Sequence, residues 1–123
     1  MSKPVGPYSP IVRAGDWLIV SGQLGIVDGK LVEGGVKQQM SAAIENLKAL
    51  LESQSASLKD VVKNTVFLCD MADFAEMNEA YIAGFGDHKP ARSSIGVAAL
   101  PFGAAVEIES WAFVGKPGSN EAD

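Results

Sequence analysis

An apolar stripe within residues 36–52 places the strongest constraint on the fold. It consists of Val36, Met40, Ile44, Leu47 and Leu51, which follow one another three or four residues apart. This spacing is typical of one side of an α-helix. The opposite side carries charged and amide residues, namely Lys37, Gln38, Glu45, Lys48 and Glu52. A helix that is apolar on one side only needs a partner surface, which the rest of the chain must supply.

A second helix and five strands are predicted to supply that surface. The helix begins near Asp73, which with Glu76 has the spacing of a capping box, and it ends at Gly86. Its apolar stripe consists of Phe74, Met77, Tyr81 and Phe85. The strands are predicted over residues 11–15, 16–23, 61–70, 92–99 and 105–114. This order predicts an α+β fold, in which one sheet carries both helices on a single face.

Length and charge limit the class of protein. The 123 residues suit a single domain, which we expect over residues 1–114, followed by a flexible polar tail over residues 115–123. The formal net charge is −5 and the lysines are scattered, so no nucleic-acid partner is expected. No apolar run approaches the roughly 20 residues of a membrane span, and the first residues contain no secretory signal. We therefore expect a cytoplasmic protein with no membrane partner.

Cysteine and histidine each occur once, at Cys69 and His88. A single cysteine forms no disulfide within the chain, and the pair supplies too few ligands for a Cys/His zinc site. Cys69 lies in the apolar segment 61–70 and is expected to be a buried structural thiol. His88 lies in a turn-rich segment and is expected at the surface. Neither residue is predicted to act as a nucleophile or a base.

The last two predicted strands carry the charged residues that point to a function. Their apolar faces consist of Ile95 and Val97 in one strand, and of Val106, Ile108, Ala112 and Val114 in the other. If the strands pair antiparallel, matching these faces puts Arg92 on the same open face as Glu107. The other residues expected there are Ser94, Gly96, Glu109, Trp111 and Phe113. Aromatic and charged side chains on an open sheet face indicate an interface between copies of the chain.

Arg92 and Glu107 are the candidate catalytic residues. Arg92 could form a structural ion pair with a glutamate, or its planar guanidinium could hold a ligand carboxylate through two parallel hydrogen bonds. Glu107 could hold a water molecule and act as a general base or acid. A carboxylate clamp beside a positioned water is the minimum needed to hydrolyse the C=N bond of a small acid. These residues alone do not single out that reaction.

Six short segments together resemble one protein family. They are "GPYSP" at 6–10, "VSGQ" at 20–23, "ENLKALLE" at 45–52, "VVKNTVFLCDMADFAEMNEAY" at 61–81, "PARSS" at 90–94 and "VEIE" at 106–109. They occur in the order typical of the reactive intermediate deaminase family, also called Rid or YjgF. They extend over nearly the whole chain, from about residue 5 to residue 114. The sequence therefore resembles the RidA-like branch of this family.

The resemblance implies a fold, an assembly and an activity. The expected fold is a chorismate-mutase-like α+β domain with a mixed sheet, assembled as a homotrimer with ligand clefts between subunits. The expected activity is that of a 2-iminobutanoate/2-iminopropanoate deaminase. Such an enzyme hydrolyses reactive 2-imino acids and their enamine tautomers to 2-keto acids and ammonia. The resemblance implies no metal and no organic cofactor.

The resemblance also assigns roles to individual residues. Arg92 would bind the substrate carboxylate, and Glu107 would position the attacking water. The expected substrate-binding residues are Tyr8, Gly22, Asn78 and Ser94, the last through its main-chain N–H group. Structural roles stay open for three of these residues. Tyr8 could be a packing residue, Gly22 could be a strand end, and Asn78 could hydrogen-bond the backbone.

Several departures from the family pattern bear on substrate preference, among them Gly25 in place of a common proline after "SGQ". Ser94 stands where many members have cysteine, and Gly96 and Ala99 stand where glutamate and arginine are common. The alternative function is a non-catalytic regulator that binds a keto acid or another small carboxylate through Arg92, and only turnover separates the two. Ribonuclease activity, ascribed to some relatives, is disfavoured by the acidic charge and the scattered lysines.

Overall fold

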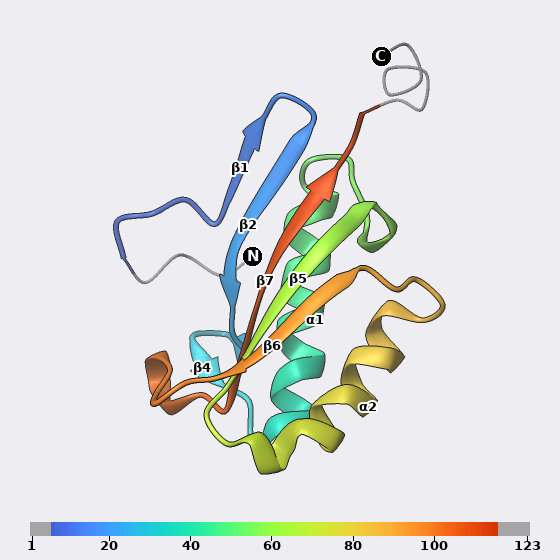
Figure 1. Ribbon diagram of the computed structural model, residues 1–123. Helices are drawn as coiled ribbons and strands as arrows, with labels where there is room; N and C mark the ends of the chain where they lie inside the picture. The colour runs from blue at the N-terminus through green and yellow to red at the C-terminus, as the bar shows by residue number, and fades with distance from the viewer. Residues whose placement is uncertain (1–5, 116–123) are drawn as a thin grey trace.

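The computed structural model describes residues 6–115 and shows a five-stranded sheet with two helices on one face (Figure 1). The sheet consists of β1 (Ile11–Ala14), β2 (Trp17–Gln23), β5 (Val61–Leu68), β6 (Ala91–Gly96) and β7 (Val106–Phe113). The helices are α1 (Val36–Glu52) and α2 (Phe74–Phe85), and a separate hairpin consists of β3 (Ile26–Val27) and β4 (Lys30–Leu31). The predicted α+β fold is confirmed. The expected tail lies outside the described residues from residue 116 onward.

The strand order is β1-β2-β7-β5-β6, which makes β6 an edge strand. β5 and β6 run parallel, whereas the other neighbouring strands of this sheet run antiparallel. The chain passes from β5 through α2 to β6, and a connection of this kind returns the second strand parallel to the first. The expected antiparallel pairing of residues 92–99 with residues 105–114 is therefore wrong, because β5 lies between these two strands.

The register of the strands puts Arg92 and Glu107 on opposite faces of the sheet. Arg92 pairs with the buried Asn64 of β5 and lies on the helix-covered face, as does Ser94 two residues later. Glu107 pairs with Phe67 of β5 and lies on the open face. Successive side chains of a strand alternate between faces, so positions 64 and 67 face opposite ways. The expectation that Arg92 and Glu107 share one face is therefore wrong.

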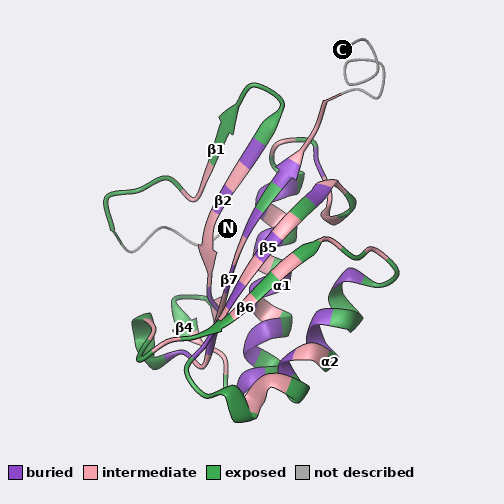
Figure 2. Ribbon diagram, viewed as in Figure 1, coloured by how far each residue is buried: buried purple, intermediate pink, exposed green. Residues whose placement is uncertain are grey.

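The core lies between the two helices and the sheet (Figure 2). All five residues of the predicted stripe on α1 are buried, and so are Leu18 of β2, Val66 of β5 and Ile108 of β7. Each such side chain contributes on the order of 2 kcal/mol when it leaves water completely. Among residues 6–115 no helix covers the open face of the sheet, and the side chains of β7 on this face are only partly buried or exposed.

A polar network crosses this core and joins three elements. The Ser110 hydroxyl of β7 donates to Asn64 Oδ1 of β5, and Asn64 Nδ2 donates to the Tyr81 hydroxyl of α2 over 2.9 Å. Ser110 and Asn64 are fully buried. Buried polar groups are costly when they lack partners, so this network fixes the position of α2 relative to the two strands.

Two local expectations need correction. Cys69 is exposed rather than buried, because β5 ends one residue before it, and its Sγ lies 3.2 Å from the Ala104 carbonyl oxygen. The capping box at Asp73 does not form, since the Asp73 side chain makes no capping hydrogen bond. Asp70 instead caps the short 3₁₀ turn that precedes α2, where it accepts from the Ala72 N–H group over 2.9 Å.

Within residues 6–115, no helix has the length and apolar character to span a lipid bilayer.

Asn64→Ala is expected to lower the free energy of unfolding by about 2 kcal/mol, because it leaves two buried or nearly buried hydroxyl groups without their amide partner. Urea denaturation at a fixed protein concentration measures the change. Gln38→Ala, at an exposed position of α1, is the control and is expected to change stability by less than about 0.5 kcal/mol. Equal stability of the two variants would contradict the role of the network.

Candidate functional site

Arg92 lies near the start of β6, beneath α2, where two aromatic rings hold its guanidinium. The Arg92 Cζ atom lies 4.6 Å from the centre of the Tyr81 ring and 5.6 Å from that of Phe74. The crossover from β5 through α2 to β6 produces this contact, because it places the helix over the edge strand. Stacking on an aromatic face orients a guanidinium without occupying its N–H groups.

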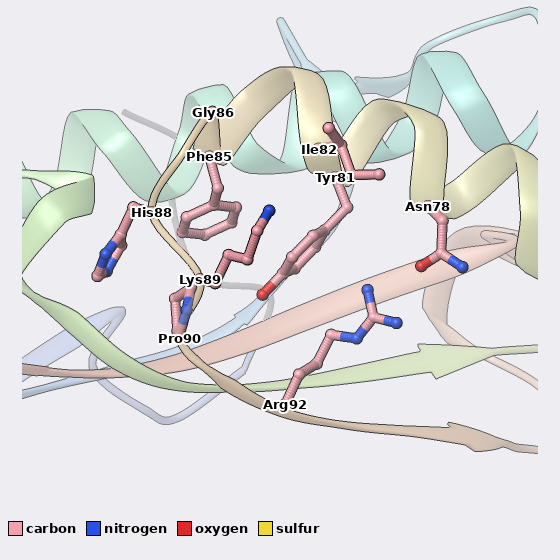
Figure 3. A pocket seen from close by; sticks show the side chains of 9 residues that line it. All are labelled: Asn78, Tyr81, Ile82, Phe85, Gly86, His88, Lys89, Pro90 and Arg92. Carbon is pink, nitrogen blue, oxygen red and sulfur yellow. The ribbon is translucent and has the colours of Figure 1, made fainter.

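The N–H groups of Arg92 face a cavity. Within residues 6–115 the guanidinium has no hydrogen-bond acceptor, and the ion pair that occurs there joins Lys37 to Glu79 instead. The cavity has a volume of about 320 Å³. Its lining residues are Asn78, Tyr81, Ile82, Phe85, Gly86, His88, Lys89, Pro90 and Arg92 (Figure 3). A half-buried guanidinium without a carboxylate partner is suited to binding an anion. The structural ion pair considered for Arg92 is not formed among the described residues.

Ser94 follows Arg92 on the same face of β6. Its hydroxyl oxygen is buried and has no hydrogen-bond partner within residues 6–115. The Val97 N–H group donates to the Leu68 carbonyl of β5, and in a parallel ladder every second residue bonds to its neighbour. The main-chain N–H of Ser94 therefore points to the unpaired edge of β6, where it is available to a ligand.

Glu107 lies on the open face of the sheet, beneath a bulge in β2. The pairing of β2 with β7 gains one residue on β2 between Val20 and Gln23, the segment that contains Gly22. A Cβ atom at Gly22 would lie 2.5 Å from Glu107 Oε2, so only glycine leaves room for this carboxylate. Bulges re-aim side chains and are frequent beside active sites. Gly22 is therefore more than a strand end, because its backbone lies in close contact with the candidate base Glu107.

The pKa of Glu107 is raised above its ordinary value. Burial is the main cause, since it disfavours the charged carboxylate, and the negative charge of Glu109 two residues later adds to the effect. Both glutamates lie on the open face, where they pair with Phe67 and Thr65 of β5. A carboxyl of this kind holds its proton to a higher pH than an exposed glutamate does, which suits a group that exchanges protons with a substrate.

The segment that carries Tyr8 lies next to this bulge. The Ser21 hydroxyl donates to the Ser9 carbonyl over 2.7 Å, and the Ser21 N–H donates to the Pro10 carbonyl over 2.9 Å. Tyr8 itself is 47% exposed. These bonds hold the Tyr8 segment beside Gly22, and therefore on the Glu107 side of the molecule.

The six expected site residues thus form two groups. One group consists of Arg92, Asn78 and Ser94, and the other of Glu107, Gly22 and Tyr8. Within one chain, β5 separates the strands of Arg92 and Glu107 by roughly 10 Å, and three residues of register add roughly 10 Å along the strands. Because the two side chains also point to opposite faces, one chain does not bring the two groups together.

Three further residues that line the cavity beside Arg92 were not predicted as site residues. Tyr81 was assigned to the apolar stripe of α2, although its ring supports Arg92 and its hydroxyl is held by Asn64. Its polar end was the signal available in the sequence. Lys89 lines the cavity, and so does His88, which is half-buried with Nε2 2.7 Å from the Val61 carbonyl rather than freely solvated. Their closeness to Arg92 in the sequence was the available signal.

Comparison with known proteins finds relatives over nearly the whole chain. The family described as Endoribonuclease L-PSP matches residues 1–114. A RutC family protein of Pyrococcus horikoshii is 47% identical over 113 residues, which cover 90% of this chain and 90% of that protein. A 2-iminobutanoate/2-iminopropanoate deaminase of Mus musculus is 42% identical over 113 residues, covering 90% of this chain and 84% of that protein. The crystal structure of RidA from an Antarctic Psychrobacter species is 44% identical with a TM-score of 0.87, covering 91% and 92% of the two chains.

Glu107→Gln is expected to change how stability depends on pH. Because the folded state raises the pKa of Glu107, it keeps a proton at pH values where the unfolded chain has released it. Stability contributed by this group is therefore present below the unfolded pKa and is lost as pH rises through the folded pKa. The variant has no carboxyl at this position and should lose less stability than the wild type between about pH 4 and about pH 8.

Thermal melting across this pH range checks the expectation, with Glu52→Gln, at an exposed position of α1, as the matched control. The melting temperature of Glu107→Gln relative to the wild type should rise as pH rises, while that of the control should not. A difference that stays constant over the range would show that burial of Glu107 has no such effect.

Proposed function

Because this chain belongs to the Endoribonuclease L-PSP family, also called the Rid or YjgF family, we propose that it hydrolyses 2-imino acids to 2-keto acids and ammonia. The observation that carries this proposal is the Arg92 guanidinium, which is stacked on Tyr81, faces a cavity and has no carboxylate partner within residues 6–115. The mouse relative is named for 2-iminobutanoate and 2-iminopropanoate, which are small carboxylates that such an arginine would bind.

In the proposed reaction Arg92 holds the substrate carboxylate and Glu107 moves the protons. Glu107 takes a proton from a water molecule as the water oxygen bonds to C2, and it passes this proton to the imine nitrogen to give a carbinolamine. The carbon–nitrogen bond then breaks, and the hydroxyl group becomes the keto group. The hydroxyl proton passes through Glu107 to the nitrogen, which leaves as ammonia. A carboxyl with a raised pKa suits both steps, because it takes up a proton and returns it.

The site is completed by a second copy of the chain in this proposal. The Arg92 group of one copy would meet the Glu107 group of the next, since one chain holds the two groups on opposite faces. The homotrimer implied by the resemblance supplies such contacts, because a closed ring repeats one interface. Asn78 and the Ser94 N–H would then contact the substrate from one side, and Tyr8 and the Gly22 backbone from the other.

The open face supports contact between copies. Trp17 packs edge-on against Trp111 and Phe113, with ring centres 5.9 and 5.1 Å apart. Trp17 is 36% exposed and Trp111 is 44% exposed. A cluster of large aromatic rings that stays this exposed is typical of an interface rather than of a free surface.

Hydrolysis is favoured over binding alone by the second half of the site. A protein that only binds a keto acid needs Arg92, but it needs no carboxyl with a raised pKa on the other side of the cleft. Glu107 is such a carboxyl, and Gly22 leaves the space that it occupies. The family description also names an endoribonuclease, but a net charge of −5 opposes the approach of a phosphate backbone.

Arg92→Ala is expected to lower kcat/KM for imine hydrolysis about a hundredfold, because it removes a charge-assisted clamp on the carboxylate. A pyridoxal-phosphate-dependent threonine dehydratase generates 2-iminobutanoate in situ, a competing amine traps it, and keto-acid release measures hydrolysis. The matched control is Arg13→Ala, which removes the only other arginine of the chain from exposed β1. No acceleration by the wild type would leave the carboxylate-binding regulator as the function. An equal loss of kcat/KM in both variants would show that Arg92 is not part of the site.

Mixed assemblies test whether the cleft lies between copies. Arg92→Ala and Glu107→Gln are each expected to be nearly inactive alone, but co-refolding them in equal amounts should restore activity. Random assortment in a ring gives about a quarter of the clefts an intact Arg92 from one copy and an intact Glu107 from the next. Co-refolding Arg92→Ala with the double variant R92A/E107Q should restore none. An absence of recovery in the first mixture would place both groups of each working site on one copy.

A further inference from the structure

Among the residues that the structure describes, two cationic side chains and no carboxylate line the cavity beside Arg92. Arg92 and Lys89 both line it, and Figure 3 shows the Lys89 side chain extending between Phe85 and Tyr81. Neither cation forms an ion pair within residues 6–115. The chain as a whole carries a net charge of −5. The cavity of about 320 Å³, with its two unpaired cations, is therefore a positively charged region on a negatively charged protein.

Tyr81 also lines this cavity, and its hydroxyl group carries a third hydrogen-bond donor. Ser110 donates to Asn64 Oδ1, which leaves the amide nitrogen of Asn64 to donate to the Tyr81 oxygen. Tyr81 therefore keeps its own hydrogen for another acceptor, and within residues 6–115 no such acceptor is found. The buried network thus turns Tyr81 into a fixed donor beside the two cations.

The walls between these groups are apolar. Ile82 and Phe85 of α2 form one side, and Pro90 forms another. Residues 89 and 92 are three positions apart, which corresponds to roughly 10 Å between their Cα atoms in an extended chain. The long side chain of Lys89 can reach into the cavity, so the distance that a ligand must bridge between the two cations is shorter. A ligand that fits has an anion at each end and a few methylene groups between them.

We propose that this cavity makes the chain selective for dicarboxylic 2-imino acids, in which a short aliphatic side chain ends in a second carboxylate. Arg92 binds the carboxylate next to the imine, while Lys89 and the Tyr81 hydroxyl bind the distal one. The methylene groups of the substrate pack on Ile82 and Phe85. This inference rests on the proposed function for the hydrolysis reaction. The preference for a second carboxylate is a property of the cavity itself. Lys89 is the specificity-determining residue.

Product binding tests the cavity without requiring turnover. Calorimetric titration of the wild type with 2-oxoglutarate and with 2-oxobutanoate compares a dicarboxylic with a monocarboxylic keto acid of similar reactivity. The wild type is expected to bind 2-oxoglutarate at least about tenfold more tightly, the effect of one added charge-assisted bond. Lys89→Met is expected to bring the ratio of the two affinities close to one, and Lys89→Glu to reverse it. Lys30→Met, on the β3–β4 hairpin, is the control for general loss of charge and should keep the wild-type ratio.

Turnover of the matching imines separates this inference from the proposed function. Amino-acid oxidases acting on glutamate and on 2-aminobutanoate generate the two imines in situ, and keto-acid release is followed as before. Equal affinities in the wild type, or an unchanged ratio in Lys89→Met, would overturn the inference even if 2-iminobutanoate is hydrolysed. Tight 2-oxoglutarate binding that depends on Lys89, without turnover of either imine, would support the cavity assignment and overturn the hydrolase.

Discussion

The connection from β5 through α2 to β6 is the constraint on which the rest of the structure depends. It makes β6 parallel to β5 and leaves it at the edge of the sheet, with α2 above it. This geometry places Arg92 against the Tyr81 ring, and it leaves the outer N–H groups of β6 without a partner strand within residues 6–115. An antiparallel β6 beside β7 would have put Arg92 on the open face near Glu107, where a carboxylate would neutralise it. The crossover is thus what keeps the cation available.

The other half of the site depends on a steric constraint. The extra residue in β2 brings the backbone at Gly22 close to Glu107, and a side chain at that position would collide with the carboxylate. Burial removes water from Glu107 and raises its pKa, and the charge of Glu109 adds to this effect. Two unrelated local features therefore produce the two groups. Stacking on Tyr81 orients the Arg92 cation, and burial raises the pKa of the Glu107 carboxyl. Only an assembly of copies joins them in the proposed mechanism.

Sequence patterns predicted the elements well but not their neighbours. The spacing from Val36 to Leu51 determined α1, and its stripe is buried as expected, because the period of a helix is a local property. Alternation in residues 92–99 separated the two faces of that strand but contains no information on which strand lies beside it. The side of Arg92 was therefore predicted wrongly. The helix between residues 68 and 91 was the missed signal, since strands joined by a crossing helix run parallel. Lys89 and Tyr81 were missed for a related reason, because a cavity between a helix and an edge strand has no sequence period.

The aromatic cluster on the open face also gives the protein an optical property. The chain has two tryptophans, and both Trp17 and Trp111 belong to this one cluster, in contact with each other and partly open to solvent. The tryptophan fluorescence of the protein therefore originates from a single patch on the open face. Emission wavelength and quenching by small solutes report on whatever covers that patch, so the natural fluorophores of this chain record its association with other copies without any attached dye.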